Sequence, residues 1–313
     1  MGGRIKCMDS MKQNTHIEHP EDSILNGDLS VLDWFSTDST VSVKIDGAPA
    51  IVWGTNPANG QFFVGTKSVF NKKKIKINHS HDEIDTHHDG DLAEILHNCF
   101  DFLPRCTSIY QGDFIGFGGC DTYTPNTLTY IFEEVISAEI IIAPHTEYIV
   151  GDIPDLREVS ARPLTHRLGD TPQVLFVKPY AKLSDNIDEI KNKCDFAKVI
   201  AASCEFPEQK VVNKIKKQIN TCIREDITLD EMLINILAHD NKVDINVMRL
   251  WKLVESIKID MLSYILVDNS LLCEFDGEPI SHEGIVMTNK YGTFKIIDRE
   301  VFSYLNFKVG GVA

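Results

Sequence analysis

The chain has 313 residues, of which 43% are hydrophobic and 25% charged. This ordinary composition excludes intrinsically disordered, collagen-like and coiled-coil proteins, and at roughly 150 residues per domain the length predicts two domains, or one with an insertion. With 46 acidic against 31 basic residues the formal charge is -15. A phosphate-binding coat over the whole surface is thereby excluded, so any nucleic-acid site must be local.

The sequence lacks the signals of a membrane or exported protein. No apolar run reaches the roughly 18 to 20 residues that span a bilayer, and the start, Met1 to Asn14, is polar. The eight cysteines form no C-x-x-C pair, which favours reduced thiols over a disulfide framework. We therefore expect a cytoplasmic protein that does not associate with membranes.

The first segment, residues 1–183, has short apolar runs broken by Gly, Pro, Asn and Asp, which is typical of strands. Asp91 to Phe102 instead has apolar residues at helical spacing. The expected strands are Val41–Val43, Ala50–Trp53, Phe62–Val64, Ile109–Gln111, Leu128–Val135 and Val174–Val177.

Residues 184–266 change to a helical period, with apolar residues recurring at steps of three and four. Asp185, Pro207, Thr228 and Asp244 stand near the expected helix starts. This segment is predicted to be a helical insert. Residues 267–313 return to strands, Gly284–Met287 and Thr293–Ile297, with a hairpin turn between them.

Several chemically suggestive residues stand at the ends of these predicted strands. Lys44, Asp46 and Gly47 form a K-x-D-G tetrapeptide directly after an apolar strand, and Glu283 opens another apolar strand, twelve positions before Lys295. Between them lie two further stretches, Gly112-Asp113 and the aromatic strand Tyr130-Ile131-Phe132.

These stretches, in this order, resemble the motifs of the covalent nucleotidyltransferase superfamily: RNA ligases, DNA ligases and messenger-RNA capping enzymes. The likeness is best to the RNA-ligase branch. The opening Thr15-His16-Ile17-Glu18-His19-Pro20-Glu21-Asp22, with Lys44 to Ala50 and Phe70-Asn71-Lys72, also resembles a group of uncharacterised bacteriophage proteins. The resemblance implies an α+β fold: a ligase-type nucleotidyltransferase domain of antiparallel sheets with flanking helices, completed by residues 267–313.

The resemblance implies that Lys44 attacks the α-phosphate of ATP and becomes a lysyl-AMP. An attacking amine must be neutral, so Lys295 and a bound Mg²⁺ (or Mn²⁺) would lower its pKa and then neutralise the phosphoryl oxygens. Glu283 would position that metal or orient the lysine. The remaining implied roles are nucleophile orientation for Asp46, a tight turn for Gly47, a ribose contact for Asp113 and base stacking for Phe132.

The sequence departs from the family pattern at three places. Thr293 stands where the family commonly has a further lysine, so Lys295 acts alone unless Lys290 or Lys308 reaches in. Asp113 replaces the usual glutamate. Only eighteen residues follow Lys295, so no appended OB-fold domain is expected, and the helical insert or a partner protein would have to seat a polynucleotide.

One local basic segment offers a contact for RNA or nicked nucleic acid. It comprises Lys67, Lys72, Lys73, Lys74 and Lys76, with Phe70 among them. Lys67 resembles the position of a family residue that contacts phosphate. A solvated loop is the alternative interpretation.

Three hypotheses follow. In the first, AMP passes from Lys44 to a polynucleotide 5′-phosphate for end joining. In the second, the acceptor is a protein or a small molecule. In the third, the chain is a catalytically degenerate module that binds a nucleotide or a partner, a hypothesis motivated by Thr293 and the shortened Asp113.

Overall fold

The computed structural model describes residues 17–268, 270–280, 282 and 284–299. Within these the chain divides into two compact units: unit 1 takes residues 45–178, and unit 2 takes residues 17–44 together with 179–299. Both units combine helices with antiparallel strands, so the fold class is mixed α+β as expected. The units cross the segment boundaries predicted from sequence, because the strand before Lys44 pairs with a strand near the C-terminus.

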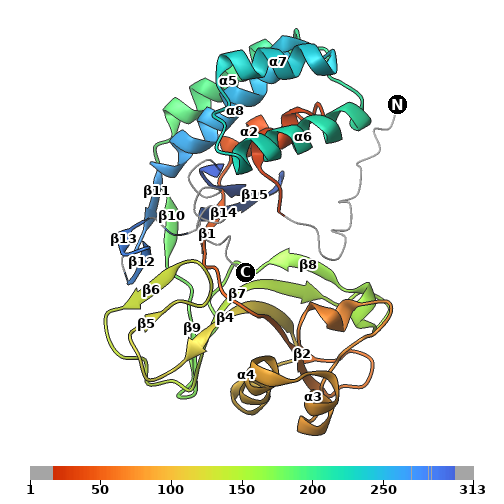
Figure 1. Cartoon of the computed structure of the whole chain (residues 1–313), viewed down its shortest axis with the longest axis vertical. Helices are drawn as coiled ribbons and strands as arrows, with labels where there is room; N and C mark the ends of the chain where they lie inside the picture. The colour runs from red at the N-terminus through yellow and green to blue at the C-terminus, as the bar shows by residue number, and fades with distance from the viewer. Residues whose placement is uncertain (1–16, 269, 281, 283, 300–313) are drawn as a thin grey trace. The chain divides into compact units, whose positions relative to one another are not determined.

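Unit 1 is built on a six-stranded sheet in the order β3-β2-β4-β7-β8, with β9 parallel to β7. All other pairs along that order are antiparallel. The strands, labelled in Figure 1, are β2 (Ala50–Thr55), β3 (Phe62–Gly65), β4 (Ile109–Phe117), β7 (Ile140–Ile149), β8 (Ser160–Pro163) and β9 (Val174–Phe176). A separate antiparallel pair joins β5 (Thr122–Tyr123) to β6 (Thr129–Phe132).

The two faces of this sheet bury different clusters. On one face Trp53 and Phe114 pack with Leu96 and Cys99 of α4 (Gly90–Phe102), which follows α3 (His81–His87). The other face packs against the short 3₁₀ helices η1 (Lys67–Phe70) and η2 (Leu156–Glu158). This second face also carries the predicted Asp113, whose register partners are Ala50 and Ala143.

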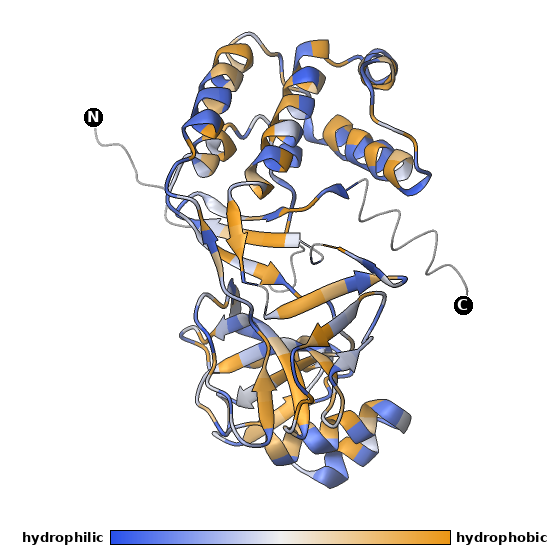
Figure 2. Cartoon of the chain, turned by 90° about the vertical axis from the view of Figure 1, so that its left-hand side faces the viewer, coloured by the Kyte–Doolittle hydropathy of each residue, from blue (hydrophilic) through white to orange (hydrophobic). Residues whose placement is uncertain are grey.

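Unit 2 contains most of the helices. They are α1 (Pro20–Ile24), α2 (Ser30–Phe35), α5 (Asp188–Ala201), α6 (Gln209–Arg224), α7 (Glu231–Asn241) and α8 (Ile245–Leu262). Four of them lie within the segment predicted to be helical, and Asp230 and Asp244 cap α7 and α8 with side-chain oxygens. Orange and blue residues alternate along these helices in Figure 2, as amphipathic helices with one buried face require.

The strands of unit 2 form three small sets. β1 (Thr40–Lys44), β14 (Gly284–Asn289) and β15 (Gly292–Ile296) make a three-stranded antiparallel sheet in the order β1-β14-β15. β10 (Ala181–Leu183) pairs with β11 (Ile265–Val267), and β12 (Leu271–Phe275) pairs with β13 (Glu278–Pro279). The predicted hairpin turn is present, with Asn289 opposite Gly292.

Two coarse expectations can be compared with the described residues. None of the described helices is both long enough and apolar enough to cross a bilayer. The seven described cysteines, from Cys99 to Cys273, are all free thiols. Burial raises the pKa of Cys106 and Cys194 to about 11, so these thiols stay protonated at neutral pH.

Candidate functional site

The predicted lysines of unit 2 lie on one face of the β1-β14-β15 sheet. Lys44 is opposite Gly284, and Lys295 is opposite Val286, which is itself opposite Ser42. Directly paired residues of antiparallel strands point to the same face, and every second residue of a strand does so too. Lys44 and Lys295 therefore share a face, with their Cα atoms about 12 Å apart for two strand spacings and two residue rises.

The opposite face of this sheet is apolar and fixes that orientation. It carries Val41, Val43, Ile285, Met287 and Phe294 in alternation with the polar residues. The Phe294 ring meets Trp34 of α2 edge to face at 5.0 Å, and the Trp34 indole donates a hydrogen bond to the Gly292 carbonyl. A shift of register by one residue would bury both lysines, so the packing holds them on the outer face.

Gly284 explains why a glycine opens β14. Its φ of +152° is one that L side chains rarely adopt, and a Cβ there would come within 2.4 Å of the Ile297 side chain. A larger residue would therefore clash with Ile297 and strain the backbone, and only glycine fits opposite Lys44. Its neighbour Glu283, the predicted metal ligand, lies outside the described residues, as does Lys308.

The hairpin does not bring Lys290 to Lys44. Lys290 lies in the turn with its ammonium 5.0 Å from the Tyr291 ring centre, whereas Lys44 pairs with Gly284 at the other end of β14, about 17 Å away for five residue rises. Thr293, where the family commonly has a lysine, lies on the polar face 3.1 Å from the Thr288 hydroxyl. Of the described lysines of this hairpin, Lys295 is therefore the one that lies on the same face as Lys44 and toward the same end of the sheet.

In unit 1, Asp46 and Gly47 run against β4. A Cβ on Gly47 would lie 2.5 Å from the Phe114 carbonyl oxygen and 3.2 Å from the Asp113 Cβ, so only glycine permits this approach. The Asp46 carboxylate accepts a 2.6 Å hydrogen bond from the Asn126 amide, and its backbone N–H donates to the Tyr130 hydroxyl at 2.7 Å. The structure thereby brings the predicted Asp46, Gly47 and Asp113 together.

Asp113 belongs to a chain of polar side chains on the same face of the sheet. Its carboxylate lies 3.5 Å from Nε2 of His145, and that nitrogen is 3.4 Å from the Gln111 amide. The Tyr148 hydroxyl donates to Gln111 at 2.7 Å, and burial raises the pKa of Tyr148 above its usual range. Gln111 and Tyr148 are buried, Asp113 is half-buried and His145 is exposed, so these contacts lead from the core to the surface at His145. We call these four residues the Asp113 corner.

Sequence analysis does not identify His145 or strand β7. The strand contains Pro144, which lacks an N–H donor and is disfavoured in central strands except at bulges. The structure has such a bulge: Gln111 pairs with Thr146 and Gly112 with Pro144, which leaves His145 unpaired in the register. A proline and a histidine inside an apolar run could have signalled a bulge that turns a polar side chain toward a site.

The aromatic side chains of strand β6, Tyr130 and Phe132, have different surroundings. Tyr130 is fully buried, and its hydroxyl holds the Asp46 backbone. Phe132 is half-buried and meets Tyr123 edge to face at 5.7 Å. Stacking of Phe132 on a base remains a prediction.

The predicted basic segment divides into exposed and anchored lysines. Lys67, Lys72, Lys73 and Lys74 are exposed, whereas the Lys76 ammonium donates to the His87 carbonyl. Phe70 does not stack on anything outside: it is buried, and its ring lies 4.4 Å from that of Tyr148. An apolar ring in the core beneath η1 has a lower free energy than it would have in water, so Phe70 anchors this segment and the exposed part of the segment consists of its lysines.

A buried charge network in unit 2 was also not predicted. The Lys258 ammonium lies 2.7 Å from the Glu21 carboxylate with both side chains fully buried, and Arg299 contacts Glu21 and Asp22. Trp251 donates to Asp22. Charged side chains are almost never fully buried unless paired, so Glu21 and Asp22 fix α1 against α8 through these contacts.

His19 lies at the edge of this network, directly before α1. Burial, together with the positive charges of Arg299 and Lys258, lowers the pKa of His19 to about 2. Among the described residues its Nδ1 is buried with no hydrogen-bond partner. His19 is therefore a neutral imidazole under all ordinary conditions, and it is the N-cap residue of the buried helix α1.

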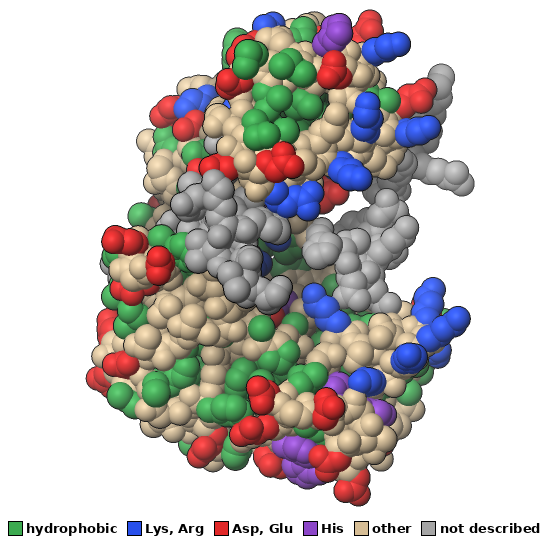
Figure 3. All heavy atoms as spheres, viewed as in Figure 1, with side chains coloured by type: hydrophobic (Ala, Val, Ile, Leu, Met, Phe, Trp, Pro, Cys, Tyr) green, Lys and Arg blue, Asp and Glu red, His purple; other side chains and the backbone are tan. Residues whose placement is uncertain are grey.

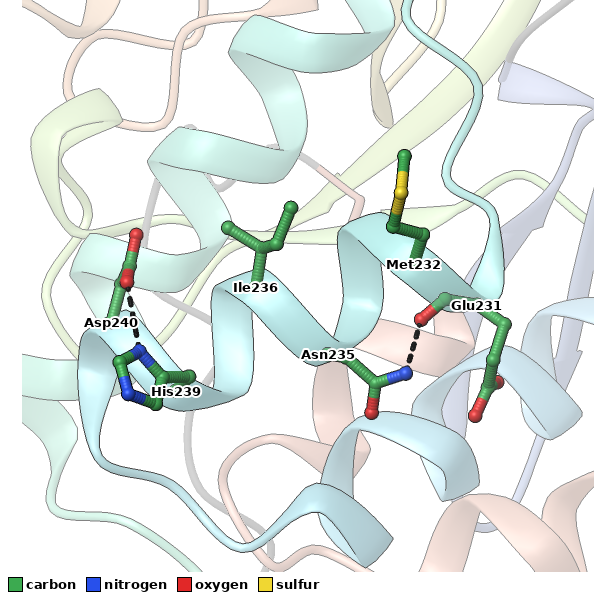
Figure 4. A pocket seen from close by; sticks show the side chains of 6 residues that line it. All are labelled: Glu231, Met232, Asn235, Ile236, His239 and Asp240. Carbon is green, nitrogen blue, oxygen red and sulfur yellow. Dashed lines mark hydrogen bonds and ion pairs between the residues drawn. The ribbon is translucent and has the colours of Figure 1, made fainter.

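Two further features do not add to the site. No three His, Cys, Asp or Glu side chains of the described residues converge to hold a metal ion. A shallow pocket on unit 2, shown in Figure 4, is lined by Glu231, Met232, Asn235, Ile236, His239 and Asp240. All six come from α7 alone, and none is a predicted site residue.

The family of unknown function DUF6267 matches residues 14–234 and 208–310, and the chain belongs to it. Comparison with curated proteins gave no match. Comparison with solved structures gave none either.

Proposed function

We propose that the protein is an ATP-dependent nucleotidyltransferase resembling RNA ligases, with a ligase-type nucleotidyltransferase fold and Lys44 as its nucleophile. One observation carries the proposal: Lys44, the glycine of the Glu283-Gly284 motif and Lys295 occupy adjacent strands of one small sheet, and both lysines are on the same face. Two lysines about 12 Å apart at Cα can both reach one phosphoryl group with their long side chains.

The first step transfers AMP to the protein. The neutral Nζ of Lys44 attacks the α-phosphorus of ATP, the bond from that phosphorus to the bridging oxygen breaks, and pyrophosphate leaves. A proton is lost from Nζ, and a phosphoramide bond to AMP remains. Lys295, on the same face, would attract the phosphoryl oxygens as negative charge develops on them.

In the second step the acceptor is a polynucleotide 5′-phosphate. One of its oxygens attacks the phosphorus of the lysyl-AMP, the nitrogen–phosphorus bond breaks, and Lys44 regains a proton. Asp113 is the candidate partner of a ribose hydroxyl. Its position between Gly47 and His145 supports this role, since a carboxylate accepts two hydroxyl hydrogen bonds.

A divalent cation fits this surface only as a partner of the nucleotide. Mg²⁺ or Mn²⁺ would screen the phosphate charge during the transfer. Because the described residues offer no set of three ligands, the phosphates themselves would supply most of its oxygens, with Glu283 as the predicted protein ligand.

The experiment that tests the proposal is intact-mass spectrometry after incubation with ATP and Mg²⁺. We expect wild-type protein to gain one AMP, roughly 329 Da, as covalent lysine catalysis requires, and Lys44→Ala to gain none. Ser42→Ala is the matched control because Ser42 lies on the same face of β1, one pleat away. It should be labelled like the wild type.

Three outcomes would contradict the proposal in different ways. Labelling of Lys44→Ala at the wild-type rate would exclude Lys44 as the nucleophile. Binding of ATP without any adduct would favour the degenerate binding module. An adduct that is discharged to proteins or small molecules, and never to a 5′-phosphate end, would keep the first step and replace the acceptor.

A further inference from the structure

Helix α6 is a concentration of positive charge in an acidic protein. Its sixteen residues include Lys210, Lys214, Lys216, Lys217 and Arg224 and no carboxylate. The neighbouring helices differ: α5 has three lysines and three acidic residues, and α7 has two acidic residues and neither lysine nor arginine. With a net charge of -15 over the chain, a helix without a single acidic residue is a local exception.

Four of these cations form a line on one side of the helix. At 100° per residue, Lys210, Lys214, Lys217 and Arg224 fall within an arc of about 80°, and they extend over about 21 Å of helix. All four side chains are exposed. We call this line the α6 stripe. Figure 3 shows Lys and Arg side chains gathered over the part of unit 2 where α6 lies.

The helix holds the stripe in a fixed orientation. Val212, Ile215, Ile219 and Ile223 are buried on the opposite side, and Lys216, which is off the stripe, pairs with Glu18 at 3.4 Å. Gln218 accepts a hydrogen bond from Asn241 of α7 at 2.8 Å. Because the helix is fixed on its inner side, the stripe cannot turn inward to find partners.

Acidic groups occur only at the ends of α6. Glu208 precedes the helix, and Glu225 and Asp226 follow it. Within the described parts of the chain, no carboxylate lies in ion-pair distance of a stripe cation, in contrast to Lys193 and Lys198 of α5, which have such partners. Uncompensated cations in a row raise the local positive potential, which favours a polyanion.

We infer that the α6 stripe binds the phosphate backbone of a nucleic acid. Its length corresponds to about six nucleotide steps at 3.4 Å per step of one strand. Two residues beside the stripe, Asn213 and Asn220, carry amide donors of the kind that contact phosphate and sugar oxygens. Since no bases are read by such contacts, binding is expected to depend on charge and not on sequence.

The same helix is poorly suited to a membrane surface. An interfacial helix inserts a broad apolar face between lipids, but the apolar face of α6 is already buried within unit 2. The stripe would then attract anionic lipid by charge alone. Nucleic acid is the polyanion that the hydrogen-bond donors beside the stripe also fit.

The α6 stripe would give a polynucleotide acceptor a surface to bind, which deepens the proposed function. The inference rests on the proposed function only for the claim that the bound nucleic acid is also the acceptor of AMP. Binding is measured without ATP, on protein that also carries Lys44→Ala. Failure to bind and failure to form an adduct are therefore separate results.

The test is fluorescence anisotropy of the full chain with a labelled 20-nucleotide RNA of mixed sequence, at several salt concentrations. Lys214→Gln/Lys217→Gln should weaken binding roughly 10- to 30-fold near 0.1 M salt, and should lower the slope of log affinity against log salt by about 1.4, at 0.7 per single-strand phosphate contact. The control, Lys182→Gln/Lys191→Gln, removes the same charge from exposed lysines elsewhere in unit 2 and should leave both values unchanged.

Further arms decide what the stripe recognises. Single-stranded DNA and an RNA duplex of the same length should compete with the labelled RNA for binding. Their relative affinities show which form of nucleic acid the stripe prefers. Equal weakening by the stripe and the control variants would overturn the inference, as would no binding by wild type, or binding to phosphatidylserine vesicles but not to any oligonucleotide. Circular dichroism and thermal unfolding of both variants check that a loss of binding is not a loss of fold.

Discussion

The charged residues of the two units are held in different ways. In unit 2, Glu21 and Lys258 are sealed in the core beside Arg299, and the two predicted lysines stand on a regular sheet. In unit 1, the Asp113 corner lies at a bulge, where His145 is exposed and its Nε2 is 3.4 Å from the Gln111 amide and 3.5 Å from the Asp113 carboxylate. From this difference we expect the charges of unit 2 to sustain the fold as well as the proposed chemistry, and those of the Asp113 corner to contact the proposed nucleotide.

The largest expected effect is on the buried pair. Lys258→Met should lower the free energy of unfolding by about 3 to 5 kcal/mol, because it leaves the Glu21 carboxylate in the core without its ammonium partner. Urea unfolding measures this. The double variant Glu21→Gln/Lys258→Met should recover much of the loss. A single variant as stable as wild type would show that unit 2 does not depend on its buried charges.

Substitution of Lys295 separates the two roles of charge in unit 2, because it should slow formation of the AMP adduct without changing the free energy of unfolding. Lys295→Ala is expected to slow formation of the AMP adduct about 100- to 1000-fold, the usual cost of removing one group that stabilises a developing charge. Its free energy of unfolding should change by less than about 0.5 kcal/mol, as for other surface substitutions.

The matched control is Thr293→Ala, on the same strand and the same face. It removes a hydroxyl that contacts Thr288 but no positive charge, so adduct formation should continue near the wild-type rate. If both variants slowed the reaction equally, the strand and not the Lys295 charge would be responsible.

His19 should make the free energy of unfolding depend on pH. Its pKa is about 2 in the folded protein and about 6.5 when unfolded, so between these values only the unfolded chain takes up the proton. Stability is therefore complete above pH 6.5 and falls as the pH decreases below it, by about 2 kcal/mol at pH 5 for this group.

Urea unfolding at pH 7 and pH 5 tests this expectation on wild type and on His19→Gln. The wild type should lose about 2 kcal/mol more than the variant over this interval. Other groups that titrate in the range, such as His88 and His282, whose pKa values burial also lowers, are common to both proteins and cancel. Equal losses would mean that His19 is accessible to protons in the folded state.

The regular parts of the molecule could be predicted from the sequence, because each has a clear period. Polar and apolar residues alternate in Val41–Lys44 and again in Thr293-Phe294-Lys295, which predicts one polar face for each of these strands. The same holds for α5 to α8, whose apolar residues recur at helical steps.

The irregular and buried polar parts could not be predicted in this way. Strand β7 is not predicted from the sequence because it contains Pro144, which a central strand accepts only at a bulge. That bulge directs the His145 side chain to Asp113. Glu21 and Lys258 are 237 residues apart in sequence, and each of them, considered alone, would be predicted to be an exposed charged residue. Only the packing of α1 on α8 makes them a buried pair.

The smallest expected effect belongs to unit 1. Asp113→Asn keeps the shape of the side chain but removes its charge, so ATP should bind about tenfold more weakly if the carboxylate accepts ribose hydroxyls, a loss of about 1.4 kcal/mol. The free energy of unfolding should stay within about 0.5 kcal/mol of wild type, since among the described residues the ion-pair partner of the Asp113 carboxylate is the exposed His145, at 3.5 Å.

Asp91→Asn, on the exposed first turn of α4, is the matched control and should change neither ATP affinity nor stability. Isothermal titration with ATP and urea unfolding provide both measurements. A loss of stability in Asp113→Asn comparable to that of Lys258→Met would erase the difference between the two units. A loss of affinity alone would instead identify the Asp113 corner as a surface that binds a ligand, since the negative charge would then contribute to binding ATP and not to the stability of the fold.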